Sequence, residues 1–380
     1  MIAVGLMSGT SLDGIDAALV RIEPTAESYA IDLLDFQTHV FDSDLNRRLR
    51  DALPPSSGSV TIAAQLHRDL GNAFAAAAES VVGGHSIDYA ASHGQTVWHD
   101  GPHHVSLQIG DPFAIREALS ATVCFDFRSA DLAAGGCGAP LVPYVDALLL
   151  GSTHEDRIAV NLGGIANITV VPRQGDVIAF DSGPANMLID AFVSERTMNR
   201  SAYDDAGASA LAGKVDAGLL SSMLRDPYFS GPAPKSTGRE RFGKQFLDER
   251  AADFQGLSLE DGAATLAELT AASVADAIRQ HARAGARIFV SGGGAQNGAI
   301  MRALEQRLPD FSVEKTSRMN LDPDAKEAIA FAVLGYETLR GRASNVPRVT
   351  GANRAVPLGA IAPFNLRSLL SKMDAECASL

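Results

Sequence analysis

The chain has 380 residues, of which 46% are hydrophobic and 20% are charged, as in a globular protein with a substantial core. A formal net charge of −13 without clustered basic tracts excludes a protein that binds nucleic-acid phosphates. Three cysteines without CxxC spacing fit a reduced compartment. Since we see neither a signal-peptide pattern nor an apolar run of bilayer length, we expect a cytoplasmic protein without a membrane partner.

The first part of the chain predicts strands on either side of a glycine-rich turn. Apolar residues 2–6 run into the stretch MSGTSLDGID, and apolar residues 15–20 follow it. Residues 29–41 predict a further strand, and three- and four-residue apolar spacing predicts a helix over 63–81.

Two more strands and a helix are expected before residue 129. The stretch IDYAASHGQTVWHD predicts a short strand that ends in a polar loop, and ATVCFDF predicts a buried strand. Between them, Asp111 and Pro112 are typical of an N-cap and a first helical position.

The pattern then begins again. The stretch RIAVNLGGIANITVV predicts a strand, a glycine turn and a strand, and DVIAFDSGPANMLIDAFV predicts a strand that leads into a helix beginning at Pro184. Helices over 263–284 and 325–339 flank the strand of RIFVSGGGAQN. A polar excursion over 226–244 has the length of a functional loop. Two such halves predict a duplicated α/β fold with a cleft between them.

The turn in MSGTSLDGID is longer and more polar than hairpin loops usually are. Successive N–H groups, with the hydroxyls of Ser8, Thr10 and Ser11, suit phosphate oxygens. It is not a Walker A loop, because GK[ST] is missing, nor a Rossmann fingerprint, because a strand follows it. A plain hairpin loop is the simpler alternative.

Two later glycine clusters are candidates for the rest of a nucleotide site. NLGGIAN lies in the equivalent strand pair and predicts a second phosphate turn. VSGGGAQN follows an apolar strand, where missing Cβ atoms would let a flat ring lie against the backbone. Taken singly, each has a simpler explanation: a bulge or packing contact for the first, and a flexible turn for the second.

Ten stretches, in order along almost the whole chain, resemble the anhydro-N-acetylmuramic acid kinase family of the hexokinase/actin-like ATPase superfamily. They are GLMSGTSLDGIDAAL, SHGQTVWH, LQIGD, DFRSADLAAGGCGAPLVP, NLGGIANIT, FDSGPANMLID, PKSTGRE, GGGAQN, DAKEAIAFAVL and PRVTGA. The chain departs from the family at Ser182 and Ala185, where Thr and Gly are more usual. Both replacements are small, and the neighbouring carboxylate is kept.

The resemblance implies an α/β fold of two actin-like ATPase domains, each a ribonuclease H-like βββαβα unit, around a central cleft. We place the N-terminal domain at residues 1–128 with approximately 346–380, and the C-terminal domain at 129–345. The family uses ATP and Mg²⁺ to open the 1,6-anhydro ring of 1,6-anhydro-N-acetylmuramic acid with water and to phosphorylate O6. The products, N-acetylmuramic acid 6-phosphate and ADP, belong to peptidoglycan recycling, and the resemblance also implies a homodimer.

The resemblance assigns the catalytic base to Asp181, which ends an apolar strand ahead of a helix. The helix dipole would favour the ionised carboxylate, whereas burial would raise its pKa. The simpler alternative is that Asp181 only caps the helix.

The resemblance also supplies the nucleotide residues, with Asp13 as the expected Mg²⁺ contact, since Mg²⁺ prefers oxygen ligands. Stabilising the turn is the alternative role for Asp13. The N-terminal loop comprises Gly9, Thr10, Ser11, Leu12, Asp13, Gly14, Ile15 and Asp16. The facing phosphate turn would be Gly163 and Gly164, and the adenosine shelf would be Gly292, Gly293 and Gly294.

Four residues are candidates for binding the sugar. Arg128 would grip the lactyl carboxylate bidentately, and Glu327 would accept hydrogen bonds from hydroxyls or the amide. His93 and Gln95 are expected in the same pocket. The histidines near His93 match no zinc spacing.

Two other functions remain open at this point. The same fold would serve a kinase for a different anhydro-sugar or sugar acid. A nucleotide-binding regulator or chaperone-like ATPase would hydrolyse ATP without regard to sugars, but Asp181 and the DFR stretch at 126–128 speak against it.

Overall fold

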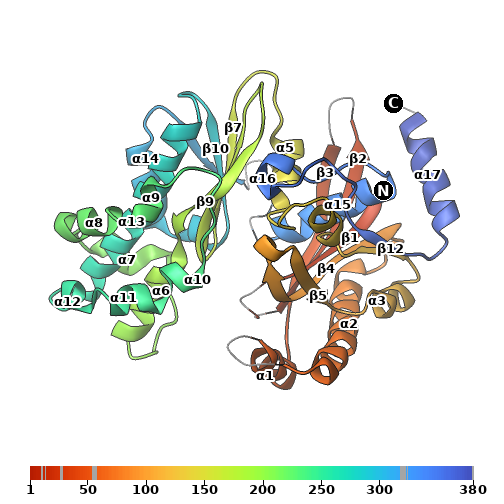
Figure 1. Ribbon diagram of the computed structural model, residues 1–380, viewed down its shortest axis with the longest axis horizontal. Helices are drawn as coiled ribbons and strands as arrows, with labels where there is room; N and C mark the ends of the chain where they lie inside the picture. The colour runs from red at the N-terminus through yellow and green to blue at the C-terminus, as the bar shows by residue number, and fades with distance from the viewer. Residues whose placement is uncertain are drawn as a thin grey trace. The chain divides into compact units, whose positions relative to one another are not determined.

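The computed structural model describes residues 1–9, 12, 14–25, 29–53, 58–316, 322 and 324–378. They form two compact units, Met1–Leu149 with Asn320–Leu380, and Leu150–Met319, each built on one sheet (Figure 1). In this described part of the chain, no helix is both long enough and apolar enough to cross a membrane.

Both sheets have the same strand order. In the first unit, β1 pairs antiparallel with β2 and β2 with β3, while β4 and β6 continue in parallel on the other side of β1. In the second unit, β7 to β11 repeat these pairings and directions. This repeat is the ribonuclease H-like order, so the duplicated α/β fold of the actin-like class is confirmed. The cleft between the domains stays a prediction.

The strands of the first sheet are β1 (Ile2–Ser8), β2 (Gly14–Pro24), β3 (Tyr29–Val40), β4 (Tyr89–Asp100), β5 (Val105–Ile109), β6 (Thr122–Phe125) and β12 (Ala360–Ala362). Those of the second are β7 (Arg157–Leu162), β8 (Ile165–Val171), β9 (Ile178–Pro184), β10 (Arg287–Ser291) and β11 (Ser312–Lys315). In the first sheet, β5 pairs with β4 and β12 with β6, which extends the common order.

The helices of the first unit are α1 (Ser43–Ala52), α2 (Val60–Val82), α3 (Pro112–Leu119), α4 (Ser129–Ala133), α5 (Val142–Leu150), α15 (Lys326–Leu339), α16 (Pro347–Thr350) and α17 (Leu366–Ala378). Those of the second are α6 (Asn186–Arg196), α7 (Ala208–Ala212), α8 (Ala217–Leu224), α9 (Pro227–Ser230), α10 (Arg239–Phe242), α11 (Lys244–Asp248), α12 (Ala251–Phe254), α13 (Leu259–His281) and α14 (Gly298–Arg307).

Strand β1 is covered on both faces. Val4 and Leu6 belong to a buried cluster with Leu66 of α2. Because side chains alternate along a strand, Gly5 faces the other side, where α15 packs. A Cβ on Gly5 would lie 1.9 Å from the Ala328 carbonyl oxygen, so the missing side chain permits this close contact. This two-sided burial explains why β1 reads as a nearly continuous apolar run.

Helix α13 is the core of the second unit. Its side chains are buried over most of its length, from Gly262 to Ile278. It packs against β8 and β9 of the sheet and against α6, α7, α8 and α14. Since a helix that is apolar on most sides must be surrounded, this packing agrees with its composition.

Most of the expected elements are confirmed, with shifted ends. The helices expected over 63–81, 263–284 and 325–339 are α2, α13 and α15. The Asp111 carboxylate accepts from the Phe113 N–H and caps α3, as expected. The strand expected in IDYAASHGQTVWHD was to be short and to end in a polar loop, but β4 continues to Asp100 by pairing with β5.

The expected helix start at Pro184 is wrong. Pro184 is the last residue of β9 and pairs with Ile165, whereas α6 begins at Asn186. The N–H groups of Ala185 and Asn186 donate to carbonyls of the Gly163–Gly164 turn. The turn therefore holds this part of the chain outside the helix.

The boundaries of the compact units differ from the expected domain boundaries. We expected residues 129–345 in the second domain, but α15 packs on β1, β2 and β4 of the first unit. Residues 129–149 also stay in the first unit. There the buried Asp131 carboxylate accepts from Gly138 N at 2.8 Å and from Asn345 Nδ2 and Thr350 Oγ1 at 2.7 Å each.

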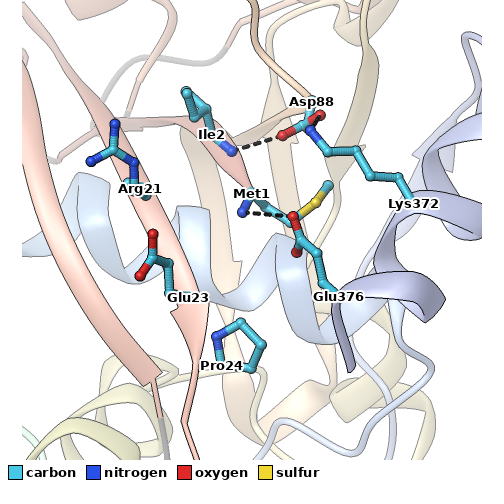
Figure 2. A pocket seen from close by; sticks show the side chains of 8 residues that line it. All are labelled: Met1, Ile2, Arg21, Glu23, Pro24, Asp88, Lys372 and Glu376. Atoms are coloured by element: carbon cyan, nitrogen blue, oxygen red, sulfur yellow. Dashed lines mark hydrogen bonds and ion pairs between the residues drawn. The ribbon is translucent and has the colours of Figure 1, made fainter. Parts of the chain in front are cut away.

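The C-terminal helix α17 is held to the first sheet by ion pairs beside a cavity of about 410 Å³ (Figure 2). Lys372 Nζ lies 2.6 Å from Asp88 Oδ1, and Asp88 Oδ2 accepts from Ile2 N at 2.8 Å. Glu376 Oε1 lies 3.4 Å from the Met1 amino group. The pairing of acidic and basic groups here serves to anchor the helix.

We expect Gly5→Ala to destabilise the protein, because the added methyl group must push α15 away from β1. The free energy of unfolding should fall by about 3 kcal/mol, at the upper end of overpacking effects. Urea denaturation measures it. Gly84→Ala is the control, since a Cβ there meets nothing within 4 Å. Equal stability of the two variants would show that the contact is loose.

Candidate functional site

The turn between β1 and β2 is braced by Gln95 of β4. The Ser8 hydroxyl lies 2.7 Å from Gln95 Oε1 and 2.7 Å from the Gly14 carbonyl oxygen. Gln95 Nε2 donates to the carbonyls of Gly9 and Thr96, at 3.2 and 3.1 Å. Gln95 is fully buried, and the donors and acceptor of its amide are satisfied by these partners within the protein. These contacts favour a role in shaping the turn over the sugar contact that we expected.

Some described residues of this turn are buried and support the fold, whereas others can still reach a ligand. Leu12 and Ile15 are buried, and Ile15 belongs to the core, so their side chains cannot reach a nucleotide. A Cβ on Gly14 would lie 2.6 Å from the His39 carbonyl oxygen. The Asp16 carboxylate accepts from the Thr38 hydroxyl at 2.6 Å. Among the described residues of the turn, the backbone groups and the Asp16 carboxylate are therefore available to a ligand.

Three residues expected in this turn, Thr10, Ser11 and Asp13, lie outside the described residues. The Mg²⁺ contact expected of Asp13 therefore stays a prediction. No group of three or more His, Cys, Asp or Glu side chains suited to a metal occurs among the residues that the structure covers. Mg²⁺ in phosphoryl-transfer sites needs only one or two carboxylates, because it keeps several waters.

His93 and Arg128 form a buried pair in the first unit. His93 Nδ1 lies 2.9 Å from the Gly94 carbonyl oxygen, which places the ring proton on Nδ1. Nε2 then accepts from Arg128, whose Nε and NH2 nitrogens lie 3.2 and 3.0 Å away. Burial, with the Arg128 charge, lowers the pKa of His93 to about 3. The imidazole is therefore neutral near pH 7 and serves as an acceptor.

The hydrogen bonds of Arg128 leave part of its donor capacity unused among the described residues. One edge, Nε with NH2, faces His93, and NH1 donates to the Gly138 carbonyl at 3.3 Å. A guanidinium has five N–H groups in a fixed plane. Three of these N–H groups are engaged, so one on NH1 and one on NH2 have no partner among the described residues and are left to donate to a carboxylate. Burial lowers the pKa of Arg128 to about 10, so it stays charged.

Glu327 lies in the first turn of α15, close to the same pair. Burial raises its pKa foremost, Lys326 and Arg128 lower it, and Asp16 and Asp146 raise it. Lys326 Nζ is paired with Asp146 Oδ1 at 2.9 Å. The first unit therefore brings together three expected residues, His93, Arg128 and Glu327, near the acidic Asp16.

The β7–β8 turn of the second unit directs its carbonyls toward the protein. The Gly163 carbonyl accepts from Asn186 N at 3.0 Å, and the Gly164 carbonyl accepts from the N–H groups of Ala185 and Met187. A Cβ on Gly163 would meet nothing closer than 3.8 Å. The turn thus has an open outer face, as a phosphate-binding turn requires.

The three glycines after β10 have different roles. A Cβ on Gly292, whose φ is 80°, would lie 2.7 Å from Asn161 Oδ1, and one on Gly294 would lie 2.6 Å from Leu162 Cβ. These two glycines are required by chain packing. Gly293 instead lines a cavity of about 500 Å³.

This cavity contains polar residues that sequence reasoning missed. Its walls come from α6, the loop before α7 and the Gly293 turn, and they include Asn186, Asp190, Tyr203, Asp205 and Gln296. Its size and mixed lining suit a nucleoside. The signal in the sequence was weak, because residues 202–206 carry no apolar period and no familiar motif.

Asp181 ends up in a different setting from the helix cap that we considered. Its Oδ2 accepts from Ser236 Oγ at 3.0 Å and from Thr237 N at 2.9 Å. Burial raises its pKa foremost, the two donors lower it, and Glu240 raises it, with a net increase. Ser236 and Thr237 were not among the expected site residues, although they lie in the 226–244 excursion and in the PKSTGRE stretch.

The comparisons with known proteins agree with this picture. The family model of anhydro-N-acetylmuramic acid kinase matches residues 1–364. The chain belongs to the anhydro-N-acetylmuramic acid kinase family.

Curated relatives match over nearly their whole length. The anhydro-N-acetylmuramic acid kinase of Streptomyces coelicolor is 42% identical over 369 residues, which cover 96% of this chain and 94% of the relative. The one from Xanthomonas axonopodis pv. citri is 44% identical, covering 95% and 97%. That of Synechococcus elongatus is 41% identical, covering 94% and 98%.

We expect Asp190→Asn to stabilise the protein above pH 6. Burial, with the nearby Asp204 charge, raises the pKa of Asp190 to about 6, so the folded state holds a proton that the unfolded state releases. Wild-type stability therefore falls as pH rises from about 4 through 6. One pKa unit corresponds to about 1.4 kcal/mol, and the partial exposure of Asp190 weakens the effect. The free energy of unfolding of Asp190→Asn at pH 7.5 should therefore exceed that of the wild type by about 1–2 kcal/mol.

Urea denaturation between pH 4 and pH 8 measures this gain, which should vanish near pH 4. Asp205→Asn changes an exposed carboxylate of the same cavity and is the control. A gain that persists unchanged at pH 4 would point to packing rather than charge.

Proposed function

We propose that the protein phosphorylates 1,6-anhydro-N-acetylmuramic acid with ATP, opening the anhydro ring with water and giving N-acetylmuramic acid 6-phosphate and ADP. The family match over residues 1–364 carries this proposal. The hydrogen-bonded Asp181 carboxylate supplies a base, and the Arg128 guanidinium supplies a cation for the carboxylate of the sugar. The activity belongs to peptidoglycan recycling in the cytoplasm.

Asp181 is the base in this proposal. Its carboxylate accepts a proton from water while the water oxygen bonds to C1 of the sugar. The C1–O6 bond breaks, and its electron pair stays on O6, which takes up the phosphoryl group. A raised pKa makes the ionised carboxylate a stronger base.

Arg128 is the residue that recognises the lactyl carboxylate. His93 and the Gly138 carbonyl hold the guanidinium in one orientation, so little side-chain freedom is lost when the sugar binds. Glu327 is placed beside it to accept from sugar hydroxyls or the acetamido N–H.

The nucleotide residues of the proposal are the turn glycines and the cavity at Gly293. ATP supplies the phosphoryl group; Gly163 and Gly164 offer backbone N–H groups to its phosphates, and the 500 Å³ cavity takes the nucleoside. The oxygens of Asp16, together with Asp13, suit a Mg²⁺ that keeps most of its waters. We also propose a homodimer, as in the family that the sequence resembles.

We expect Asp181→Asn to remove turnover while ATP still binds. Loss of a general base should lower kcat about a hundredfold or more, because nothing then accepts the proton of water. A coupled assay for ADP, with mass-spectrometric detection of the 6-phosphate, measures it. Asp253→Asn alters an exposed carboxylate on α12 and is the control. Turnover near the wild-type rate would refute the base assignment.

We expect Arg128→Gln to weaken binding of the acidic sugar selectively. KM for 1,6-anhydro-N-acetylmuramic acid should rise about tenfold or more, since a charged hydrogen bond contributes about 1.5–3 kcal/mol. KM for 1,6-anhydro-N-acetylglucosamine, which lacks the lactyl group, should change little. Arg173→Gln, at an exposed arginine, is the control. Equal increases for both sugars would rule out carboxylate recognition by Arg128.

A further inference from the structure

The segment 226–244 holds the backbone of Asp181 on both sides. Asp181 N donates to the Lys235 carbonyl at 3.0 Å, and the Tyr228 hydroxyl donates to the Asp181 carbonyl at 2.7 Å. Asp181 lies near the end of β9, where ladder pairing with β8 is interrupted by a register shift next to Asn167. The segment thus supplies partners at the place where the sheet becomes irregular.

The same segment distinguishes the two oxygens of the Asp181 carboxylate. Oδ2 accepts two hydrogen bonds, from Ser236 Oγ at 3.0 Å and from Thr237 N at 2.9 Å. Among the residues described, none donates to Oδ1. Two donors fix the plane of the carboxylate and draw electron density toward Oδ2. The oxygen that remains available to a water molecule is Oδ1.

We propose that Ser236, Thr237 and Tyr228 are positioning residues that orient Asp181 so that Oδ1 is the basic atom. The proposal rests on the proposed function in one respect, namely that Asp181 is the base. It assigns to the 226–244 segment a role in the reaction that needs no contact with sugar or nucleotide. The proton of water goes to Oδ1, while Oδ2 keeps its two donors throughout.

The segment is internally braced, as such a role requires. Lys235 Nζ donates to the carbonyls of Tyr228 and Phe229, at 2.7 and 3.2 Å, and lies 4.6 Å from the centre of the Tyr228 ring. Arg241 pairs with Asp226 and lies over the same ring at 5.4 Å. Lys235 and Arg241 are thus both engaged within the segment.

The charges around Asp181 set the direction of the expected effect. Tyr228 on α9 and Glu240 on α10 face it, Lys235 and Arg241 lie over the Tyr228 ring, and His281 of α13 contacts Phe180 beside it. Burial and Glu240 raise the pKa of Asp181, whereas the Ser236 and Thr237 donors lower it. Removing the Ser236 hydroxyl therefore raises this pKa further, so the base becomes protonated at a higher pH.

The test is the pH dependence of kcat in Ser236→Ala, with saturating ATP and sugar. The acid limb should move to higher pH by about half a unit to one unit, because one hydrogen bond to the ionised form is lost. At pH values below the pKa of the base in both proteins, kcat should fall about three- to tenfold, and it should recover toward the wild-type value at alkaline pH. KM for ATP should stay unchanged, and Ser236→Thr should restore the wild-type profile.

A second variant separates orientation from acidity. Tyr228→Phe removes the donor to the backbone carbonyl of Asp181 and leaves the carboxylate donors in place, so kcat should fall at every pH without a shift of the acid limb. Ser230→Ala is the matched control, because the Ser230 hydroxyl donates to Pro227 within the same segment. Circular dichroism and KM for ATP check that each variant is folded.

The outcomes distinguish this inference from the proposed function. If Asp181→Asn is inactive and Ser236→Ala keeps the wild-type acid limb, the base assignment holds and the positioning role is refuted. If Asp181→Asn is active, the base assignment itself fails. A shifted acid limb in Ser236→Ala, reversed by Ser236→Thr, supports the inference, since a merely structural serine would not move the titration of the base.

Discussion

The free-energy cost of removing charged groups from water is the constraint that shapes both candidate sites. An ionised side chain in a protein interior is tolerated only when hydrogen bonds replace its hydration. Arg128 meets this requirement through a neutral imidazole and a carbonyl, and Asp131 meets it through a backbone N–H, an amide and a hydroxyl. Asp181 follows the same rule with two donors on a single oxygen. In each case the partners that compensate for burial also fix the direction of the group.

Close backbone contacts are the second theme of the structure, and glycine makes them possible. Gly5 lets α15 approach β1, and Gly292 lets the chain after β10 pass Leu162. The glycines with open space, Gly163 and Gly293, face outward. One residue type therefore serves two purposes, and only the surrounding atoms reveal which purpose applies at a given position.

The strands and the long helices could be predicted because they depend on local periodicity, whereas the strand order was implied by the family resemblance. Strand β1 and helix α13 bury most of their side chains, and their apolar patterns reflect this directly. Pro184 could not be placed from sequence, because its strand conformation depends on pairing with Ile165. Gln95 was expected at the sugar, but a distant turn uses its amide. The hydrogen bonds from Ser236 and Thr237 to the Asp181 carboxylate join residues far apart in sequence, so periodicity could not predict them. The family resemblance included the PKSTGRE stretch but assigned no role to it.

The position of α15 has a consequence for how the chain is made. This helix follows the second unit in the sequence but covers β1 and β2 of the first. During synthesis the N-terminal strands emerge long before the helix that shields one of their faces. The second unit, Leu150–Met319, is one uninterrupted stretch of the chain. The face of β1 and β2 that α15 covers therefore stays exposed until the whole second unit and α15 have been synthesised.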